Sequence, residues 1–161
     1  MQGASEKIES QKEVTCCVAG HRNIPAEQMA HVKQELYREV EAAIADGYQL
    51  FLTDFMEGTD QLFAEVVAEL MQETSDLRLE AVLPYRSRRD ELLADEKTMP
   101  LILACTDTSY TGDKYTPGSY TTGRRAQLKR SGRIIVVFDG RDNGGTVKAI
   151  RLAHMQNVPI R

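Results

Sequence analysis

Glycine, histidine, arginine and threonine gather in two short stretches of this sequence, and these residue types suit the binding of an anion. A Gly-His-Arg step at residues 20–22 follows an apolar run, and a Gly-Gly-Thr step at residues 144–146 precedes an amphipathic one. Arginine is a bidentate donor for phosphate or carboxylate. Paired glycines before a helix let a ligand approach the free N–H groups of the first turn. Both steps therefore predict contacts to an anion, with an ordinary turn and helix cap as the alternative for residues 144–146.

Other residues could complete such a site, and each has a plainer alternative. Gly58 and Thr59 open a second amphipathic run, where an ordinary helix start would use the same residues. Arg124 would add positive charge near a later helix start, or would belong to a solvated face. His21 can donate, accept or titrate near neutral pH. It could instead bond to a neighbouring loop and only order the mouth of the cleft.

Several other chemistries are excluded by what the sequence lacks. It has no CxxC or HExxH motif and no paired histidine spacing, so we expect no metal site. It has no GxxxxGK[ST] loop and no GxSxG step, and no cofactor is expected. The three cysteines, two of them adjacent in an apolar run, do not make a disulfide framework. Reduced thiols and a cytoplasmic location follow as expectations.

The elements that must position these residues alternate regularly along the chain. Apolar runs at residues 14–19, 48–53, 77–83 and 133–138 predict strands, with a further short strand near 108–111. Amphipathic runs predict helices after Pro25 to about 46, at 59–71, from a capping box at Ser87 to about 103, at 122–130 and at 146–156. This alternation predicts an α/β, Rossmann-like three-layer sandwich, with a mostly parallel central sheet and helices on both faces. In such sheets ligands bind beyond the carboxyl ends of the strands, where the motifs fall.

Length and charge limit the organisation and the partners. The chain has 161 residues, 42% of them hydrophobic, which is enough for one domain, predicted at residues 13–161 after a flexible lead-in at 1–12. The formal net charge of -4 disfavours nucleic acid as a partner. No apolar run is long enough to cross a bilayer, so no membrane partner is expected. Pairing into a homo-oligomer stays open, because no residue identifies an interface.

Taken in order, the motifs resemble the SLOG superfamily, and within it the YpsA-like branch of small bacterial Rossmann-like proteins. The likeness covers about residues 14–160. It rests on a strand ending in Gly-His-Arg, a Gly-x-Asp helix start with a Glu five residues later, a Leu-Pro-Tyr strand end, a tyrosine-rich loop before an arginine pair, and Val-Val-Phe-Asp-Gly followed by Gly-Gly-Thr. The superfamily also contains the LOG phosphoribohydrolases and the DNA-processing DprA proteins.

The resemblance implies a cleft that binds a nucleotide or a nucleotide derivative. From the motifs and the resemblance together, the candidate ligand-binding residues are Gly20, His21, Arg22, Gly58, Thr59, Arg124, Gly144, Gly145 and Thr146. Three positions depart from the family pattern. Asp54 stands where relatives commonly have glycine, Arg125 where they read asparagine, and Ala149 where LOG hydrolases carry a glutamate.

Three functions are consistent with this sequence. The first is a non-catalytic or sensing module that binds a nucleotide-like small molecule. The alternative is a LOG-like N-glycosidase acting on nucleoside monophosphates, with Asp60 or Glu65 as the acid or stabilising carboxylate. The glutamate missing at Ala149 makes an enzyme the weaker expectation. The third is single-strand DNA binding, for which residues 110–130 supply tyrosines and basic side chains, against the acidic net charge.

Overall fold

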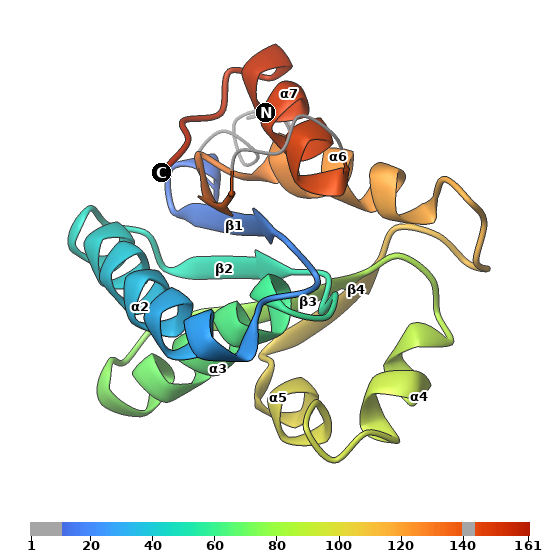
Figure 1. Ribbon diagram of the computed structural model, residues 1–161, viewed down its shortest axis with the longest axis horizontal. Coiled ribbons are helices and arrows are strands. Elements are labelled where there is room, and N and C mark those ends of the chain that lie inside the picture. The colour runs from blue at the N-terminus through green and yellow to red at the C-terminus, as the bar shows by residue number, and fades with distance from the viewer. Residues whose placement is uncertain (1–10, 140–143) are drawn as a thin grey trace, which may run out of the picture.

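The computed structural model describes residues 11–139 and 144–161, and in these ranges five strands form one parallel sheet. The strands are β1 (Thr15–Gly20), β2 (Leu50–Thr53), β3 (Arg78–Leu83), β4 (Asp107–Tyr110) and β5 (Arg133–Val137). Their order is β4-β3-β2-β1-β5, so β1 lies between β2 and β5 (Figure 1). The parallel sheet confirms the predicted fold class.

Helices cover both faces of the sheet. They are α2 (Met29–Ala45), α3 (Thr59–Glu73), α4 (Arg88–Leu93), α5 (Met99–Ala104), α6 (Ser119–Arg130) and α7 (Gly145–Met155), with a 3-10 turn at Ala26–Gln28. Buried side chains of α2, α3, α4 and α5 belong to one hydrophobic cluster, and those of α6 and α7 to another. The sheet therefore separates two core layers, as Figure 1 shows.

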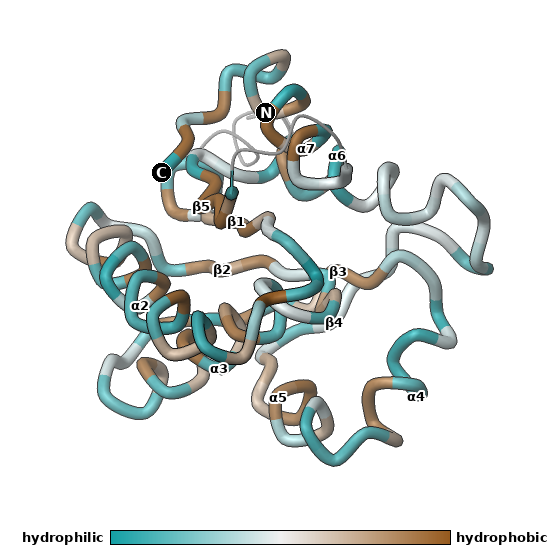
Figure 2. Tube along the Cα trace, in the orientation of Figure 1, coloured by the Kyte–Doolittle hydropathy of each residue, from teal (hydrophilic) through white to brown (hydrophobic). Residues whose placement is uncertain are grey.

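Strand β1 shows why a short apolar run becomes a central strand. Successive side chains of a strand point to opposite faces. Cys16 and Val18 accordingly pack in the cluster under α2 and α3, whereas Cys17 and Ala19 pack in the cluster under α6 and α7. All four are buried, which requires apolar residues at every position. In Figure 2, β1 appears as a hydrophobic stretch in the middle of the molecule.

The single helix predicted from Ser87 to about residue 103 is wrong, because the chain forms two short helices there, α4 and α5. The Asp95 carboxylate accepts the N–H of Lys97 at 2.8 Å, a local turn that competes with the helix. The buried Thr98 hydroxyl donates to the Leu92 carbonyl at 2.5 Å and fixes the break. Ser87 makes no side-chain capping bond, so the predicted capping box does not form either.

The remaining boundaries lie close to those predicted. The short strand expected near residues 108–111 is the edge strand β4, and α6 begins three residues before the predicted 122. Within the described ranges, no helix has the length and apolar character needed to span a membrane. The predicted lead-in falls largely on residues 1–10, and part of the loop after β5 on residues 140–143, both outside the described residues.

Candidate functional site

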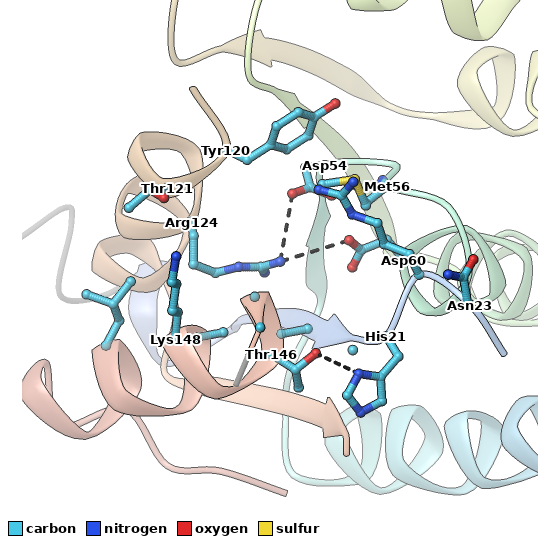
Figure 3. A pocket seen from close by; sticks show the side chains of 17 residues that line it. His21, Asn23, Asp54, Met56, Asp60, Tyr120, Thr121, Arg124, Thr146 and Lys148 are labelled. Atoms are coloured by element: carbon cyan, nitrogen blue, oxygen red, sulfur yellow. Dashed lines mark hydrogen bonds and ion pairs between the residues drawn. The ribbon is translucent and has the colours of Figure 1, made fainter. Parts of the chain in front are cut away.

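A cavity of about 370 Å³ opens at the carboxyl ends of β1 and β2, beside the first turns of α3, α6 and α7 (Figure 3). This is the edge of the sheet at which the sequence predicted a ligand site. Of the predicted site residues, the cavity is lined by Gly20, His21, Arg22, Asp60, Arg124, Gly144, Gly145 and Thr146. Of the three residues that depart from the family pattern, Asp54 and Ala149 line the cavity and Arg125 does not.

Gly58 and Thr59, two predicted site residues, do not line the cavity and instead contact the loop after β1. The backbone N–H and the hydroxyl of Thr59 both donate to the His21 carbonyl, at 3.2 and 3.0 Å. Gly58 has a φ of +79°, and a Cβ there would lie 2.3 Å from the Arg22 carbonyl oxygen. A Cβ on Gly20 would meet the Thr59 side chain at 2.3 Å. Gly58 is therefore required by the close approach of the backbone after β1, and Gly20 by the close approach of the Thr59 side chain.

His21 is fixed between the end of β5 and the start of α7. Its Nε2 accepts the N–H of Asp139 at 3.1 Å and lies 3.1 Å from that residue's carboxylate oxygen. Its Nδ1 lies 3.4 Å from the Thr146 hydroxyl, and its ring stacks on Phe138 with centroids 6.1 Å apart. These contacts are those of the alternative in which His21 orders the mouth of the cleft, and Figure 3 shows its ring turned toward Thr146 at the rim of the cavity that it lines.

The first turn of α7 forms one side of the cavity. Gly144 precedes the helix with a φ of +99°, and Gly145, Thr146 and Lys148 line the cavity. The N–H groups at the start of an α-helix have no partner within the helix, and its dipole makes this end attractive to an anion. No atom of the described residues lies within 4 Å of a Cβ built on either glycine, so none of these residues blocks the approach of a ligand to their backbone.

Arg124 lies beside two acidic residues that also line the cavity, Asp54 and Asp60, which we call the acidic pair. Its Nη2 lies 3.7 Å from the Asp54 carboxylate and 3.9 Å from the Asp60 carboxylate. Its Nη1 donates to the Val18 carbonyl of β1. Each of the two aspartates is only 3% exposed. The predicted ligand-binding Arg124 thus already has internal partners from β1, the β2 loop and α3.

The acidic pair contains a buried oxygen without a partner. Asp54 Oδ1 accepts the N–H of Met56 at 3.0 Å, whereas Asp60 Oδ1 has no hydrogen-bond partner among the described residues. Burial, and after it the charge of Asp54, raises the pKa of the Asp60 carboxyl well above its usual range. The protonated, uncharged form of the Asp60 carboxyl is therefore favoured in the folded protein.

The cations at the mouth of the cavity are Arg22 and Lys148. Arg22 lies over the Tyr120 ring, with its guanidinium carbon 5.9 Å from the centroid. Both cations are exposed, and neither forms an ion pair within the part of the chain that the structure describes. They are therefore available to an anion in a way that Arg124 is not.

Sequence reasoning did not include Lys148 and Tyr120 among the ligand-binding residues. Both carry a positional signal, since Lys148 lies in the first turn after the Gly-Gly-Thr step and Tyr120 lies one helical turn before Arg124. Asn23, Met56, Thr121 and Leu152 also line the cavity, and no motif marks them.

Glu65 is not brought to the cavity. It lies on α3, with a carboxylate oxygen 3.4 Å from Lys33 Nζ of α2, and lines a separate hollow beside α5. Among the described residues no cluster of histidine, cysteine or acidic side chains could hold a metal ion. Burial raises the pKa of the Cys17 thiol to about 11 and that of Cys105 to about 12, so neither is an activated nucleophile.

A parallel sheet in this order, with a cavity at the carboxyl ends of its strands and glycines at two adjoining helix starts, defines a Rossmann-like protein. The YpsA family model, described as "YspA SLOG family", matches residues 17–158, and the chain belongs to this family.

Of the other two comparisons, one found no match and the other shows the fold. No curated protein matches the chain significantly. Among solved structures, it is similar to DNA processing protein A from Helicobacter pylori, described for its single-stranded DNA binding mode, with a TM-score of 0.61 and 15% identity. The alignment covers 98% of this chain and 67% of that one.

Proposed function

We propose that the protein binds a nucleotide-like small molecule, with the phosphate at the start of α7. The observation that carries this proposal is the position of Arg22 and Lys148 at the mouth of a cavity that also contains the first turn of α7. A helix start combines N–H donors with a favourable dipole, and cations beside it form charge-assisted hydrogen bonds with phosphate oxygens. A small anion needs only this local field, so the net charge of -4 does not oppose it.

The size of the cavity supports a small ligand. Pockets for small molecules usually have volumes of roughly 300 to 1,000 Å³. Ala149 stands where the LOG hydrolases, to which the sequence has a resemblance, carry a glutamate. It lines the cavity and is 1% exposed. A methyl group cannot accept or donate a proton, which favours binding or sensing over N-glycosidic cleavage. Of the two carboxyls considered for cleavage, Asp60 lines the cavity and Glu65 does not.

We expect the wild-type protein to bind AMP or ADP-ribose in isothermal titration calorimetry, with inorganic phosphate as a competitor. Arg22→Gln and Lys148→Gln should each weaken AMP binding by about tenfold, because each loses one charge-assisted hydrogen bond to phosphate. Lys129→Gln is the matched control, because Lys129 lies in the last turn of α6 and does not line the cavity. The proposal fails if the folded wild-type protein binds no nucleotide, or if all three variants bind AMP equally well.

A second candidate function is supported by a cluster of tyrosines and arginines next to the cavity. The Tyr85 ring contacts Tyr115 and Tyr120 edge-on, with centroids 5.6 and 6.4 Å apart, and Arg86 lies 4.9 Å over the Tyr110 ring. Tyr115 is 63% exposed. Aromatic platforms with nearby cations are used to bind single-stranded nucleic acid, which is also the subject of the H. pylori structure.

If this second function is correct, a labelled oligo(dT) should bind at low salt in a fluorescence anisotropy titration. Tyr115→Ala should then weaken binding by roughly 5- to 100-fold, because stacking contributes about 1–3 kcal/mol per base. Leu103→Ala is a suitable control, because Leu103 is 64% exposed, belongs to α5 and takes no part in the ring contacts of the tyrosines. Absence of binding at low salt would exclude this function.

A further inference from the structure

The cavity has two chemically opposite walls. The start of α7 and Lys148 favour a negative group, whereas Asp54 and Asp60 on the other side offer carboxyl oxygens (Figure 3). A phosphate would be repelled by these oxygens and is expected at α7. Whatever part of the ligand faces the acidic wall must therefore supply hydrogen-bond donors.

The acidic wall lacks a partner that a ligand could provide. Asp60 is 3% exposed and lines the cavity, yet its Oδ1 makes no hydrogen bond to any described residue. A buried polar atom without a partner destabilises the folded protein, and the great majority of such atoms in proteins are paired. A hydrogen-bond donor on the ligand would give Asp60 Oδ1 the partner that it lacks.

The charge balance shows which donors fit best. Arg124 already neutralises one carboxylate, at 3.7 Å from Asp54 and 3.9 Å from Asp60. Arg124 is thus already the cationic partner of this group, so neutral hydroxyl donors suit the remaining carboxyl oxygen better than a second cation.

The position of Asp54 indicates which hydroxyl groups of a ligand would act as the donors. It follows β2 directly, and in nucleotide-binding α/β folds an acidic residue at the end of the second strand accepts hydrogen bonds from ribose hydroxyls. We infer that a nucleotide whose phosphate lies at α7 places its sugar between the two walls, where Asp54 and Asp60 bind the 2′- and 3′-hydroxyls of a ribonucleotide. The site then selects ribonucleotides over 2′-deoxyribonucleotides. This inference rests on the function proposed above.

The test compares AMP with dAMP by isothermal titration calorimetry on the full chain. Wild-type protein should bind AMP about 10- to 100-fold more tightly, because dAMP leaves a buried carboxyl oxygen unpaired. Asp54→Asn and Asp60→Asn should each reduce this ratio at least threefold, and the double variant should bring it close to one. The ability of inorganic phosphate to compete should be retained. Asp90→Asn, an exposed position on α4, is the matched control and should keep the wild-type ratio.

The outcomes separate this inference from the proposed function. Equal affinity of the wild-type protein for AMP and dAMP, with both displaced by phosphate, overturns the inference and leaves the proposed function standing. If the double variant still prefers AMP over dAMP as strongly as the wild-type protein does, the inference is also overturned. If neither nucleotide binds, both fail. The wild-type ratio needs no variant, so the inference stays testable even if an asparagine variant does not fold.

Discussion

Replacing Arg124 with methionine should lower the free energy of unfolding by about 3–5 kcal/mol, the usual result of breaking a buried ion pair from one side. Asp54 and Asp60 would lose the only cation that the structure places within 4 Å of either carboxylate among the described residues. The Val18 carbonyl would also lose its arginine donor. Urea unfolding followed by circular dichroism measures the change.

The matched control for Arg124→Met is Arg125→Met, its exposed neighbour on the same helix. A surface substitution of this kind should stay within about 0.5 kcal/mol of wild type. In an Asp54→Asn, Asp60→Asn background, Arg124→Met should be much less destabilising, since no buried carboxylates remain to be neutralised. Equal destabilisation in the two backgrounds would contradict the ion-pair explanation.

The effect of Arg124→Met should also depend on pH. Burial and Asp54 raise the pKa of the Asp60 carboxyl in the folded protein, so its protonated form is favoured there. A group with a raised folded pKa stabilises the protein at low pH, and this stabilisation is lost as the pH rises through the folded pKa. The loss is larger without Arg124, so the gap between wild type and variant should widen with rising pH.

Gly58→Ala should destabilise the protein by about 2–4 kcal/mol, because it combines a strained backbone conformation with a steric clash. The φ of +79° is unfavourable for alanine, and the new Cβ would lie 2.3 Å from the Arg22 carbonyl oxygen and 2.5 Å from that of His21. These are backbone atoms of the loop after β1, which cannot move without disturbing the contacts of Thr59. The thermal unfolding midpoint or the urea midpoint measures the effect.

The Gly47→Ala variant separates the cost of the strained backbone conformation from the cost of the steric clash. Gly47 also has a positive φ, +99°, but in the described part of the chain no atom lies within 4 Å of a Cβ built there. Its substitution should therefore show only the conformational cost, about 1–2 kcal/mol. If Gly47→Ala and Gly58→Ala destabilise the protein equally, the close approach of the loop after β1 to α3 contributes nothing.

The order of elements could be predicted from the sequence because the signals are local. The apolar run of β1 and the Gly-Gly-Thr step before α7 each report on a few neighbouring residues, and both lie where predicted. The break between α4 and α5 was missed because it depends on two side-chain hydrogen bonds, one accepted by Asp95 and one donated by Thr98 across six residues. Periodicity does not reveal such a bond.

The cavity was predicted less completely than the fold. Its position follows from the topology, so Gly20, His21 and Thr146 were found. The partners of Arg124 were not, because Asp54 and Asp60 lie more than sixty residues away in the sequence. A side chain that looks free in a sequence can be fully engaged in the fold, and only the packing distinguishes the two.

The alternation of side chains along β1 has a practical consequence. Cys16 and Cys17 are adjacent in the chain, yet each belongs to a different core layer, and both are 0% exposed. Burial raises the pKa of both thiols, so a labelling reagent reacts only after the covering helices separate from the sheet. Single-cysteine variants would thus carry natural reporters of local opening, Cys16 for the layer of α2 and α3, and Cys17 for that of α6 and α7.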